Sequence, residues 1–275
     1  MSQTITPELR RWIVEQASAG FTPESVLQAM KVSGWQESVA LAALEEVMEN
    51  HVAQSKAPVV PQPDLSASPR WVDAGDRKVE VLVCMRSPIL VVFGNLLSED
   101  ECEGLIAAAR PRMGRSLTVQ TATGGEEVND DRTSQGMFFR RGENDVVTRV
   151  EARIARLLQW PVENGEGLQI LNYKPGAEYK PHYDYFDPRE PGTARITQRG
   201  GQRVGTLVMY LNEPVRGGGT TFPDVGLEVL PKRGHAVFFA YDRPHPATRT
   251  LHGGAPVLEG EKWVATKWLR EKEFL

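Results

Sequence analysis

The sequence predicts a mainly β (α+β) protein: a β-sandwich or barrel with supporting helices packed outside it, preceded by a small N-terminal helical bundle. Helical periodicity dominates residues 4–52. Strand-like runs and two helical segments follow, and after residue 167 short apolar runs alternate with clusters of glycine and proline. Helices first and many short strands afterwards are typical of domains in which helices cover a sheet.

Length and composition are those of an ordinary globular protein. The 275 residues allow one large domain and a small one, with 40% of them hydrophobic and 25% charged. The formal net charge of -4 does not point to nucleic acid or to an anionic membrane surface, and no apolar run approaches the length of a bilayer span. We therefore expect neither a nucleic-acid nor a membrane partner.

The N-terminal sequence and the cysteines predict a cytoplasmic location. The start, MSQTITPELRRWIVEQ, has no apolar core between a basic end and small residues, so it does not resemble a secretory signal. Cys84 and Cys102 are too few for a disulfide framework and do not have metal-ligand spacing. Two ordinary thiols in a reducing compartment are the simplest interpretation.

Residues 1–52 are expected to form the helical bundle. Thr6 and Thr22 each precede a proline suited to the first helical turn, and apolar residues recur behind them at helical spacing. Gly20 and Gly34 divide the segment, so three short helices are predicted. The arrangement is similar to ubiquitin-associated-like bundles. We interpret it as an interaction or solubility module with a protein partner, rather than one specific for a ubiquitin-type partner.

A linker and a large domain follow the bundle. Residues 53–70 are rich in proline, serine and alanine, a composition that favours an extended linker, and 71–275 form the large domain. Its first elements are the apolar runs VEVLVCM and ILVVFGN, which predict strands. The capping box SEDE then opens a helix through Ala109, and a second helix begins at about Asp145.

Six strand-like runs follow the second helix. They are LQILNY, GTLVMYL, TTFP, GLEVL, HAVFFAY and KWVATKWLR. The segment from Asp187 to Gln202 between them is long, polar and without periodicity. A loop of that length in a compact domain is often a lid or a binding loop, and we expect one here.

A histidine and a carboxylate stand one residue apart in the aromatic stretch YKPHYDYF, residues 179–186. In a strand, residues two apart project on the same side, so His182 and Asp184 could bind one metal ion together. The aromatic side chains around them could shield the ion from water. A further histidine would complete the two-histidine, one-carboxylate triad of non-heme Fe(II), which leaves three positions open.

Periodicity does not decide the third ligand. His51 ends the helical bundle and His235 begins a strand, and solvation or packing accounts for both. His245 and His252 both remain candidates. A zinc site in a hydrolase or sensor also stays open on these residues alone, because two histidines and a carboxylate can hold Zn(II).

Three long stretches occur in order: LQILNYKPGAEYKPHYDYF, QRVGTLVMYLNEPVRGGGTTFPDVGLEVLPKRGHAVFF and LHGGAPVLEGEKWVATKWLRE. They resemble the catalytic domain of prolyl 4-hydroxylases, which are Fe(II)- and 2-oxoglutarate-dependent dioxygenases, and the resemblance runs from about residue 90 to residue 272. DDRTSQGMFF resembles the family's segment ahead of its central helix. The resemblance implies a double-stranded β-helix, a jelly roll with the metal between its two sheets, and a dioxygenase catalytic domain over residues 71–275.

The resemblance also implies a ligand set. His182, Asp184 and His252 match the iron ligands of the family. Lys262 follows His252 by ten positions, as does the family lysine that binds the distal carboxylate of 2-oxoglutarate, and His245 falls outside that spacing. O2 is the second co-substrate, and the resemblance adds ascorbate as a reductant. Asp184 favours hydroxylation, because related halogenases carry a small residue in its place.

Five further residues match family positions with a role in binding. Tyr173 and Thr206 match the 2-oxoglutarate end of the site. Near the bound proline, Tyr179 would pack against the ring, Arg203 would hold a peptide carbonyl and Trp268 would form a wall. Core packing is the alternative role for the aromatic residues, and ion pairing at the start of a strand is the alternative for Arg203.

The activity that the resemblance implies is 4-hydroxylation of a prolyl residue in a peptide or protein, with succinate and CO2 as co-products. Because no secretory signal is recognised, a cytoplasmic target is expected rather than collagen-type processing, and the helical bundle could recruit it. Two alternatives remain. One is an oxygenase acting on a free amino acid or another residue type, and the other is a non-catalytic metal-binding jelly-roll interaction protein.

Overall fold

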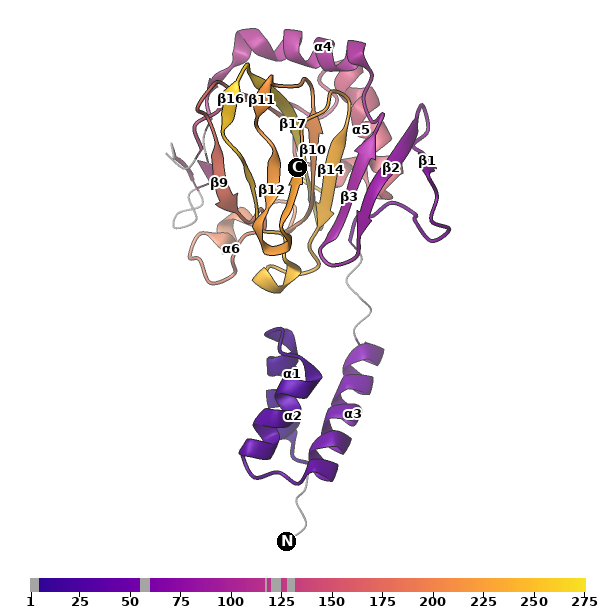
Figure 1. Cartoon of the computed structure of the whole chain (residues 1–275), viewed down its shortest axis with the longest axis vertical. Coiled ribbons are helices and arrows are strands. Elements are labelled where there is room, and N and C mark those ends of the chain that lie inside the picture. Colours follow the sequence, from indigo (N-terminus) through magenta and orange to yellow (C-terminus); the bar gives the residue numbers. More distant parts are fainter. Residues whose placement is uncertain (1–4, 55–59, 117, 120–124, 128–131) are drawn as a thin grey trace. The chain divides into compact units, whose positions relative to one another are not determined.

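The computed structural model describes residues 5–54, 60–116, 118–119, 125–127 and 132–275, which divide into two compact units, Met1–Val59 and Val60–Leu275 (Figure 1). The first two residues of the stretch DDRTSQGMFF lie outside the described residues. Within the described ranges, no helix is both long and apolar enough to cross a membrane. The predicted combination of N-terminal helices, a mainly β domain and supporting helices is confirmed.

Three helices make up the first unit: α1 Pro7–Ser18, α2 Pro23–Val32 and α3 Glu37–Gln54. The hydroxyls of Thr6 and Thr22 accept hydrogen bonds of 3.3 Å from backbone amides in the first turns of α1 and α2. A proline follows each threonine, as the sequence predicted. The unit has its own core of Leu9, Ile13, Val26, Met30, Ala40, Ala43, Leu44 and Val47.

The second half of the predicted linker is part of the second unit. Val60, Pro61 and Pro63 are buried, and the amide of Gln62 donates a hydrogen bond of 2.9 Å to the carbonyl of Leu158. Pro61 packs so closely on Gly205 that a Cβ at that glycine would lie 2.9 Å from Pro61 Cγ. The boundary between the units therefore lies at Val59/Val60, because these apolar residues dock on the sheet despite a composition typical of linkers.

Two antiparallel sheets face one another in the second unit (Figure 1), which is the arrangement of a jelly roll. The large sheet has the strand order β1 Trp71–Asp73, β2 Lys78–Met85, β3 Ile89–Gly94, β14 Ala236–Ala240, β10 Arg203–Tyr210, β17 Lys262–Arg270, β8 Leu168–Tyr173, β7 Gln135–Phe139 and β4 Gly114–Arg115. The small sheet has the order β13 Leu227–Val229, β12 Thr220–Phe222, β15 His252–Gly254 and β9 Tyr179–His182.

Short elements complete the second unit. They are the pairs β11 Arg216–Gly217 with β16 Val257–Glu259 and β5 Thr118–Val119 with β6 Glu126–Glu127, the helix α6 Thr193–Ile196, and the 3-10 turns η1 Arg110–Arg112, η2 Val162–Asn164, η3 Pro223–Val225 and η4 Pro246–Thr248. Helix α6 lies within the polar segment from Asp187 to Gln202. The side-chain amide of Gln202 bonds both backbone groups of Phe186 at 2.8 Å, so the two ends of that segment are held together.

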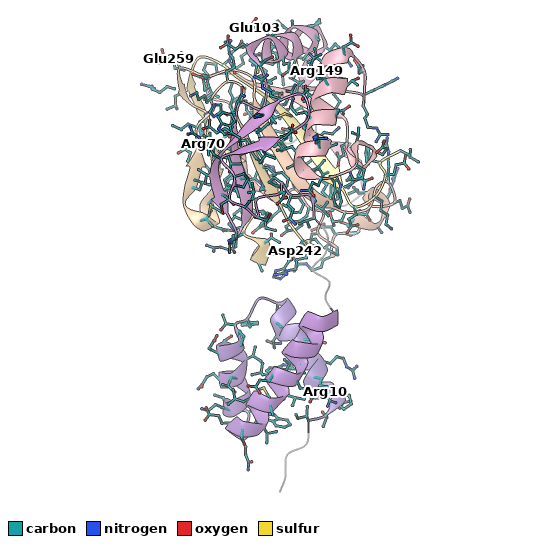
Figure 2. All side chains as sticks on the ribbon, turned by 90° about the vertical axis from the view of Figure 1, so that its right-hand side faces the viewer. Arg10, Arg70, Glu103, Arg149, Asp242 and Glu259 are labelled. Carbon is teal, nitrogen blue, oxygen red and sulfur yellow. The ribbon has the colours of Figure 1, made fainter. Side chains whose placement is uncertain are left out.

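Helices α4 Glu99–Ala109 and α5 Asp145–Leu158 pack on the outer face of the large sheet. The predicted capping box is present: the Ser98 hydroxyl accepts from the Glu101 amide, and the Glu101 carboxylate accepts from the Ser98 amide. Glu101 also pairs with Arg153 at 2.7 Å and with Arg149 at 2.9 Å, which lies on α5 in Figure 2. These charges tie α4 to α5, because the buried Glu101 needs cationic partners.

Strand β17 separates two cores by its alternation. Trp263, Ala265 and Leu269 join the core under the helices, while Val264 joins the core between the two sheets. Lys262 has the same parity as Val264, so its side chain also faces the space between the sheets. The alternation of side chains along β17 thus places Lys262 between the two sheets of the jelly roll. The candidate functional site lies in the same space.

Removing residues 1–59 is predicted to leave the second unit folded, whereas removing residues 1–70 is predicted to lower its melting temperature. The second deletion exposes surface that Val60, Pro61 and Pro63 cover and breaks the bond to Leu158. A loss of about 2 kcal/mol in the free energy of unfolding is expected from that burial. Thermal unfolding of both truncations measures it, and equal melting temperatures would contradict the placement of the boundary.

Candidate metal and co-substrate site

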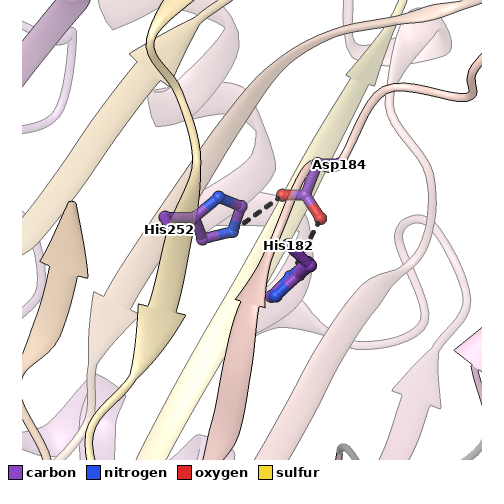
Figure 3. A group of neighbouring side chains, drawn as sticks. All are labelled: His182, Asp184 and His252. Carbon is purple, nitrogen blue, oxygen red and sulfur yellow. Dashed lines mark ion pairs between the residues drawn. The ribbon is translucent and has the colours of Figure 1, made fainter. Parts of the chain in front are cut away.

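Strand pairing brings the two histidines together. Strands β9 and β15 are antiparallel neighbours, and His182 stands directly opposite His252. Asp184 follows β9 and lies 3.6 Å from His182 and 3.4 Å from His252, measured from a carboxylate oxygen to each Nε2 (Figure 3). The three ligand atoms lie within 4.8 Å of one another. One ion can therefore contact all three.

Glycine allows this close approach. A Cβ at Gly253 would lie 2.9 Å from the carbonyl oxygen of Tyr179 and 3.1 Å from the nitrogen of Pro181, both of which belong to β9. The register shifts between His252 and Gly254, so Gly253 sits at an irregularity of the pairing. The glycine that follows the histidine in the stretch LHGG is thus a requirement of the strand geometry.

Backbone carbonyls set the tautomers of both histidines. Nδ1 of His182 lies 2.8 Å from the carbonyl of Lys180, and Nδ1 of His252 lies 3.0 Å from that of Thr250. A carbonyl only accepts, so each Nδ1 carries a proton and each Nε2 turns a lone pair toward the space beside Asp184. Burial lowers the pKa of His182, which keeps it neutral, as a metal ligand must be.

Asp184 is held as a carboxylate by its surroundings. Burial alone would raise its pKa, but a proton that enters this cluster charges His252 or His182 rather than Asp184, and that attraction holds the carboxyl pKa well below the usual range. The Thr206 hydroxyl donates to one carboxylate oxygen at 2.7 Å. Two neutral imidazoles and one oriented carboxylate on the same side fit the facial triad of non-heme Fe(II), with the opposite side left for other ligands.

Arg203 lies behind Asp184 and is engaged by protein groups. Its Nε and Nη2 donate to Glu166 at 2.7 and 2.9 Å, and its Nη1 lies 3.4 Å from the Asp184 carbonyl. The guanidinium also stacks 4.0 Å from the ring of Trp268. Of the two roles expected for Arg203, these contacts correspond to ion pairing.

Thr206 lies beside the metal ligands rather than beside Lys262. It lines the cavity and stands opposite Trp268 in the sheet, six positions along β17 from Lys262. Its hydroxyl donates to Asp184 and lies 3.0 Å from the hydroxyl of Tyr241. The expected role at the 2-oxoglutarate end therefore does not correspond to its contacts, because its one proton is already directed at Asp184.

A buried ammonium that forms no ion pair with a described carboxylate lies at the other end of the cavity. Lys262 is 3% exposed, and it forms no ion pair or hydrogen bond with the described residues. The rings of Tyr173 and Tyr210 lie 5.4 and 5.9 Å from Nζ. Burial lowers the pKa of Lys262 to about 8, and the negative charge of Glu228 offsets this only in part. A buried cation without an ion pair fits an anionic ligand, because a buried charge that is not compensated is costly.

Thr220 is the threonine that sequence reasoning missed at this end. It lines the same cavity and its hydroxyl accepts from Tyr210 at 2.8 Å, which leaves its own proton free to donate. Tyr173, opposite Lys262 in the sheet, also lines the cavity. Its hydroxyl forms no hydrogen bond with a described residue. Two hydroxyls and one ammonium thus lie together where a carboxylate would fit. The strand-like run TTFP predicted a strand here, but nothing in the sequence indicated that Thr220 would face the cavity.

The remaining walls come from residues expected near the substrate. The cavity of about 50 Å³ is lined by both Tyr179 and Trp268. Tyr179 stacks on His182 with ring centroids 3.7 Å apart, and burial raises its pKa to about 12. Trp268 Nε1 is buried without a hydrogen-bond partner among the described residues. Arg132, which sequence reasoning passed over in the stretch DDRTSQGMFF, is buried over the Tyr179 ring at 5.0 Å.

Comparison with known proteins places this geometry in context. The model of the 2OG-Fe(II) oxygenase superfamily matches residues 168–270. Prolyl 4-hydroxylase 5 of Arabidopsis thaliana is 42% identical over 221 residues, which are 73% of this chain and 74% of the relative. Prolyl 4-hydroxylase 1 of the same plant is 42% identical over 229 residues, 74% of this chain and 78% of the relative.

A solved structure is similar to this chain in both sequence and fold. The viral collagen prolyl hydroxylase of Paramecium Bursaria Chlorella virus-1, in complex with 2OG, has 30% sequence identity and a TM-score of 0.51. The match covers 66% of this chain and 95% of the viral one. The similarity thus spans nearly the whole viral domain.

Replacing His252 with alanine is predicted to abolish tight binding of Fe(II), because only two of the three ligands then remain. His245→Ala is the matched control. Its ring accepts a hydrogen bond from the Ala247 amide at 3.1 Å and lies outside the ligand group. Anaerobic calorimetry with Fe(II) measures both, and a larger loss for the His245 variant would reverse the assignment of the third ligand.

Proposed function

This chain belongs to the prolyl 4-hydroxylases of the 2OG-Fe(II) oxygenase superfamily, and we propose that it hydroxylates the 4-position of a prolyl residue in a peptide or protein, with succinate and CO2 as co-products. It is a dioxygenase that uses Fe(II), 2-oxoglutarate and O2. The observation that carries the proposal is the lone buried ammonium of Lys262 in the cavity that also contains the His182, Asp184 and His252 group.

Residues at the two ends of the cavity have different roles. His182, Asp184 and His252 hold the iron, which when bound supplies the activation of O2 coupled to oxidative decarboxylation of 2-oxoglutarate. When 2-oxoglutarate is bound, Lys262 would neutralise its distal carboxylate, and the hydroxyls of Tyr173 and Thr220 would donate to the same carboxylate. Because these three residues are buried, the attraction between the charges would be stronger than it is in water.

The substrate side excludes water and orients the target ring. Tyr179 covers one face of His182, and Trp268 is fixed by the guanidinium of Arg203 against its ring. Two flat walls suit the compact apolar ring of proline. Arg203, through its ion pair with Glu166, keeps Trp268 and Asp184 in place.

Cellular location and the partner of the bundle are part of the proposal. Cys84 and Cys102 are both free thiols, and burial raises the pKa of Cys102 to about 11, so that thiol is unreactive. This supports a reducing, cytoplasmic setting. The bundle of α1, α2 and α3 has its own core, which supports a separate role in recruiting the protein target.

The activity test is a search for products with one added oxygen. Purified protein incubated with Fe(II), 2-oxoglutarate and a panel of peptides is predicted to oxidise only proline-containing peptides, at C4 of the ring, and to form succinate in step. Omission of either iron or 2-oxoglutarate should abolish both signals. Oxidation of free amino acids or of proline-free peptides would instead favour the broader oxygenase, and no succinate under any condition would refute the dioxygenase activity.

The affinity for 2-oxoglutarate is predicted to fall as the pH rises through about 8. The pKa of Lys262 is lowered to about 8, so the ammonium is present below that pH and is lost above it. Because the carboxylate binds the charged form, the dissociation constant should rise by about tenfold per pH unit beyond the pKa. Calorimetry between about pH 7 and pH 9.5, with Mn(II) in place of Fe(II), measures this.

Two variants distinguish the titration of Lys262 from that of other groups. Lys262→Arg keeps its charge over that range and should give a flat profile. Lys262→Met should weaken binding at pH 7 by about 10- to 100-fold, the loss of a charged hydrogen bond. A wild-type affinity that does not change with pH, or a Lys262→Arg profile as steep as the wild type, would contradict the assigned role.

A further inference from the structure

A groove of about 880 Å³ lies in the second unit and shares no lining residue with the metal and co-substrate cavity. Its floor includes Val91, a member of the core under the helices, and Val81, which packs against that core. Cys84 stands opposite Val91 in the pairing of β2 with β3, so it faces the same side. The cavity is lined from the core between the two sheets. The groove and the cavity therefore open on opposite faces of the large sheet, with β2 and β3 on one side of the unit and β9 on the other (Figure 1).

The walls of the groove are largely apolar. Half of the apolar wall comes from residues 60–70 and half from strands β2 and β3. The apolar wall residues are Pro63, Leu65, Pro69, Val81, Met85 and Ile89. All of them except Pro63 remain partly exposed. A hollow of this volume with apolar walls and a few polar groups has the character of a binding site.

The polar lining of the groove offers hydrogen-bond donors that the protein does not use. The side chains of Gln62, Arg86 and Gln159 line the groove and form no hydrogen bond with a described residue. The one carboxylate among the described lining residues is that of Asp64, and it already accepts from the amide and the hydroxyl of Ser66. A fitting ligand therefore presents apolar surface and carbonyl acceptors, and it needs few donors of its own.

A proline-rich chain in the polyproline II conformation has this chemistry. Proline has no backbone N–H, and the carbonyls of this conformation form no internal hydrogen bonds, so they accept from a partner. The protein provides a precedent on the same face of the sheet, where Val60 belongs to the core under the helices and Pro61 packs on Gly205. The groove runs beside this docked segment, since Gln62 and Pro63 line it.

We propose that the groove binds a proline-rich segment of the protein substrate while another proline of the same substrate occupies the cavity. The inference rests on the proposed function. Proline rings would pack on the apolar walls, and Gln62, Arg86 and Gln159 would donate to carbonyls of the segment. Holding one segment raises the local concentration of the rest of the substrate at the cavity, which lowers KM without a change in kcat.

The size of the second unit sets the spacing between the two segments. A compact unit of this length has a diameter of about 45 Å, so the path around it from one face to the other is about 70 Å. At about 3.1 Å per residue this path needs about 20 to 25 residues of extended chain. A substrate with a shorter spacer cannot occupy both sites at once.

The binding test uses the full chain and a thiol reagent. Cys102 is buried and its pKa is raised to about 11, so Cys84 in the groove is the reactive thiol of the two. An oligoproline peptide is expected to slow the reaction of Cys84 several-fold, and a proline-free peptide of leucine and serine with the same length is not. Equal protection by both peptides overturns the assignment to proline, and no protection by either overturns the groove as a site. Protection that grows with protein concentration in the absence of peptide assigns the groove to a second copy of the chain and also overturns the proposal.

The kinetic test compares peptides with one proline-rich motif and with two. With a spacer of about 25 residues, the KM of the two-motif peptide is expected to be about tenfold below that of the single-motif peptide, and a spacer of about 5 residues should remove the gain. Succinate formation measures both. Equal KM values for the long and the short spacer contradict simultaneous binding at the two sites.

Cys84→Trp fills the groove, and Cys84→Ser is its matched control. Cys84 is exposed, so both variants should fold, and equal melting temperatures check this. The tryptophan variant is expected to raise the KM of the long two-motif peptide to the single-motif value and to leave kcat unchanged, since Cys84 does not line the cavity. The same KM for that peptide in both variants overturns the proposal. Absence of succinate from every sample refutes the proposed function, whereas the protection of Cys84 still tests the groove by itself.

Discussion

The pairing of β9 with β15 is the constraint on which the site depends. His182 and His252 are seventy positions apart in the chain, and they become neighbours only because their strands are adjacent in the small sheet. The pairing also directs their Nδ1 atoms at backbone carbonyls, which presents both Nε2 atoms to Asp184. A slip of one residue would turn one imidazole to the other face of the sheet and remove the ligand set.

The buried cations of the second unit differ in whether they form an ion pair, and this difference indicates which of them binds a ligand. Lys267, five positions along β17 from Lys262, faces α5 and pairs with the buried Glu151. Arg203 is paired with Glu166, and Arg153 is paired with Glu101. Lys262 forms no such ion pair with a described residue, and Glu228 acts on it only from a distance. Since buried charges are ordinarily compensated, this exception distinguishes a binding group from a structural one.

Local signals in the sequence predicted most of the elements, and the triplet of His182 and Asp184 marked the site. The strands of the large sheet from β8 to β17 are apolar runs or runs in which apolar and polar residues alternate, and the capping box predicted the start of α4. Family resemblance, not periodicity, distinguished His252 from His245. The sequence could not predict that Thr220 lines the cavity or that the Thr206 hydroxyl donates to Asp184, because both depend on strand register in the two sheets. Residues 60–70 were misleading because proline-rich composition is the same for a docked segment and a free one.

The unpaired ammonium also couples the stability of the fold to its co-substrate. A lysine whose pKa falls from 10.5 to about 8 on folding disfavours the folded state wherever the unfolded chain is charged, by about 3 kcal/mol below pH 8, and the penalty disappears above pH 10.5. A dianion that binds only the folded state offsets this cost, since its carboxylate compensates the charge. The same residue therefore makes the empty domain less stable and the loaded one more stable.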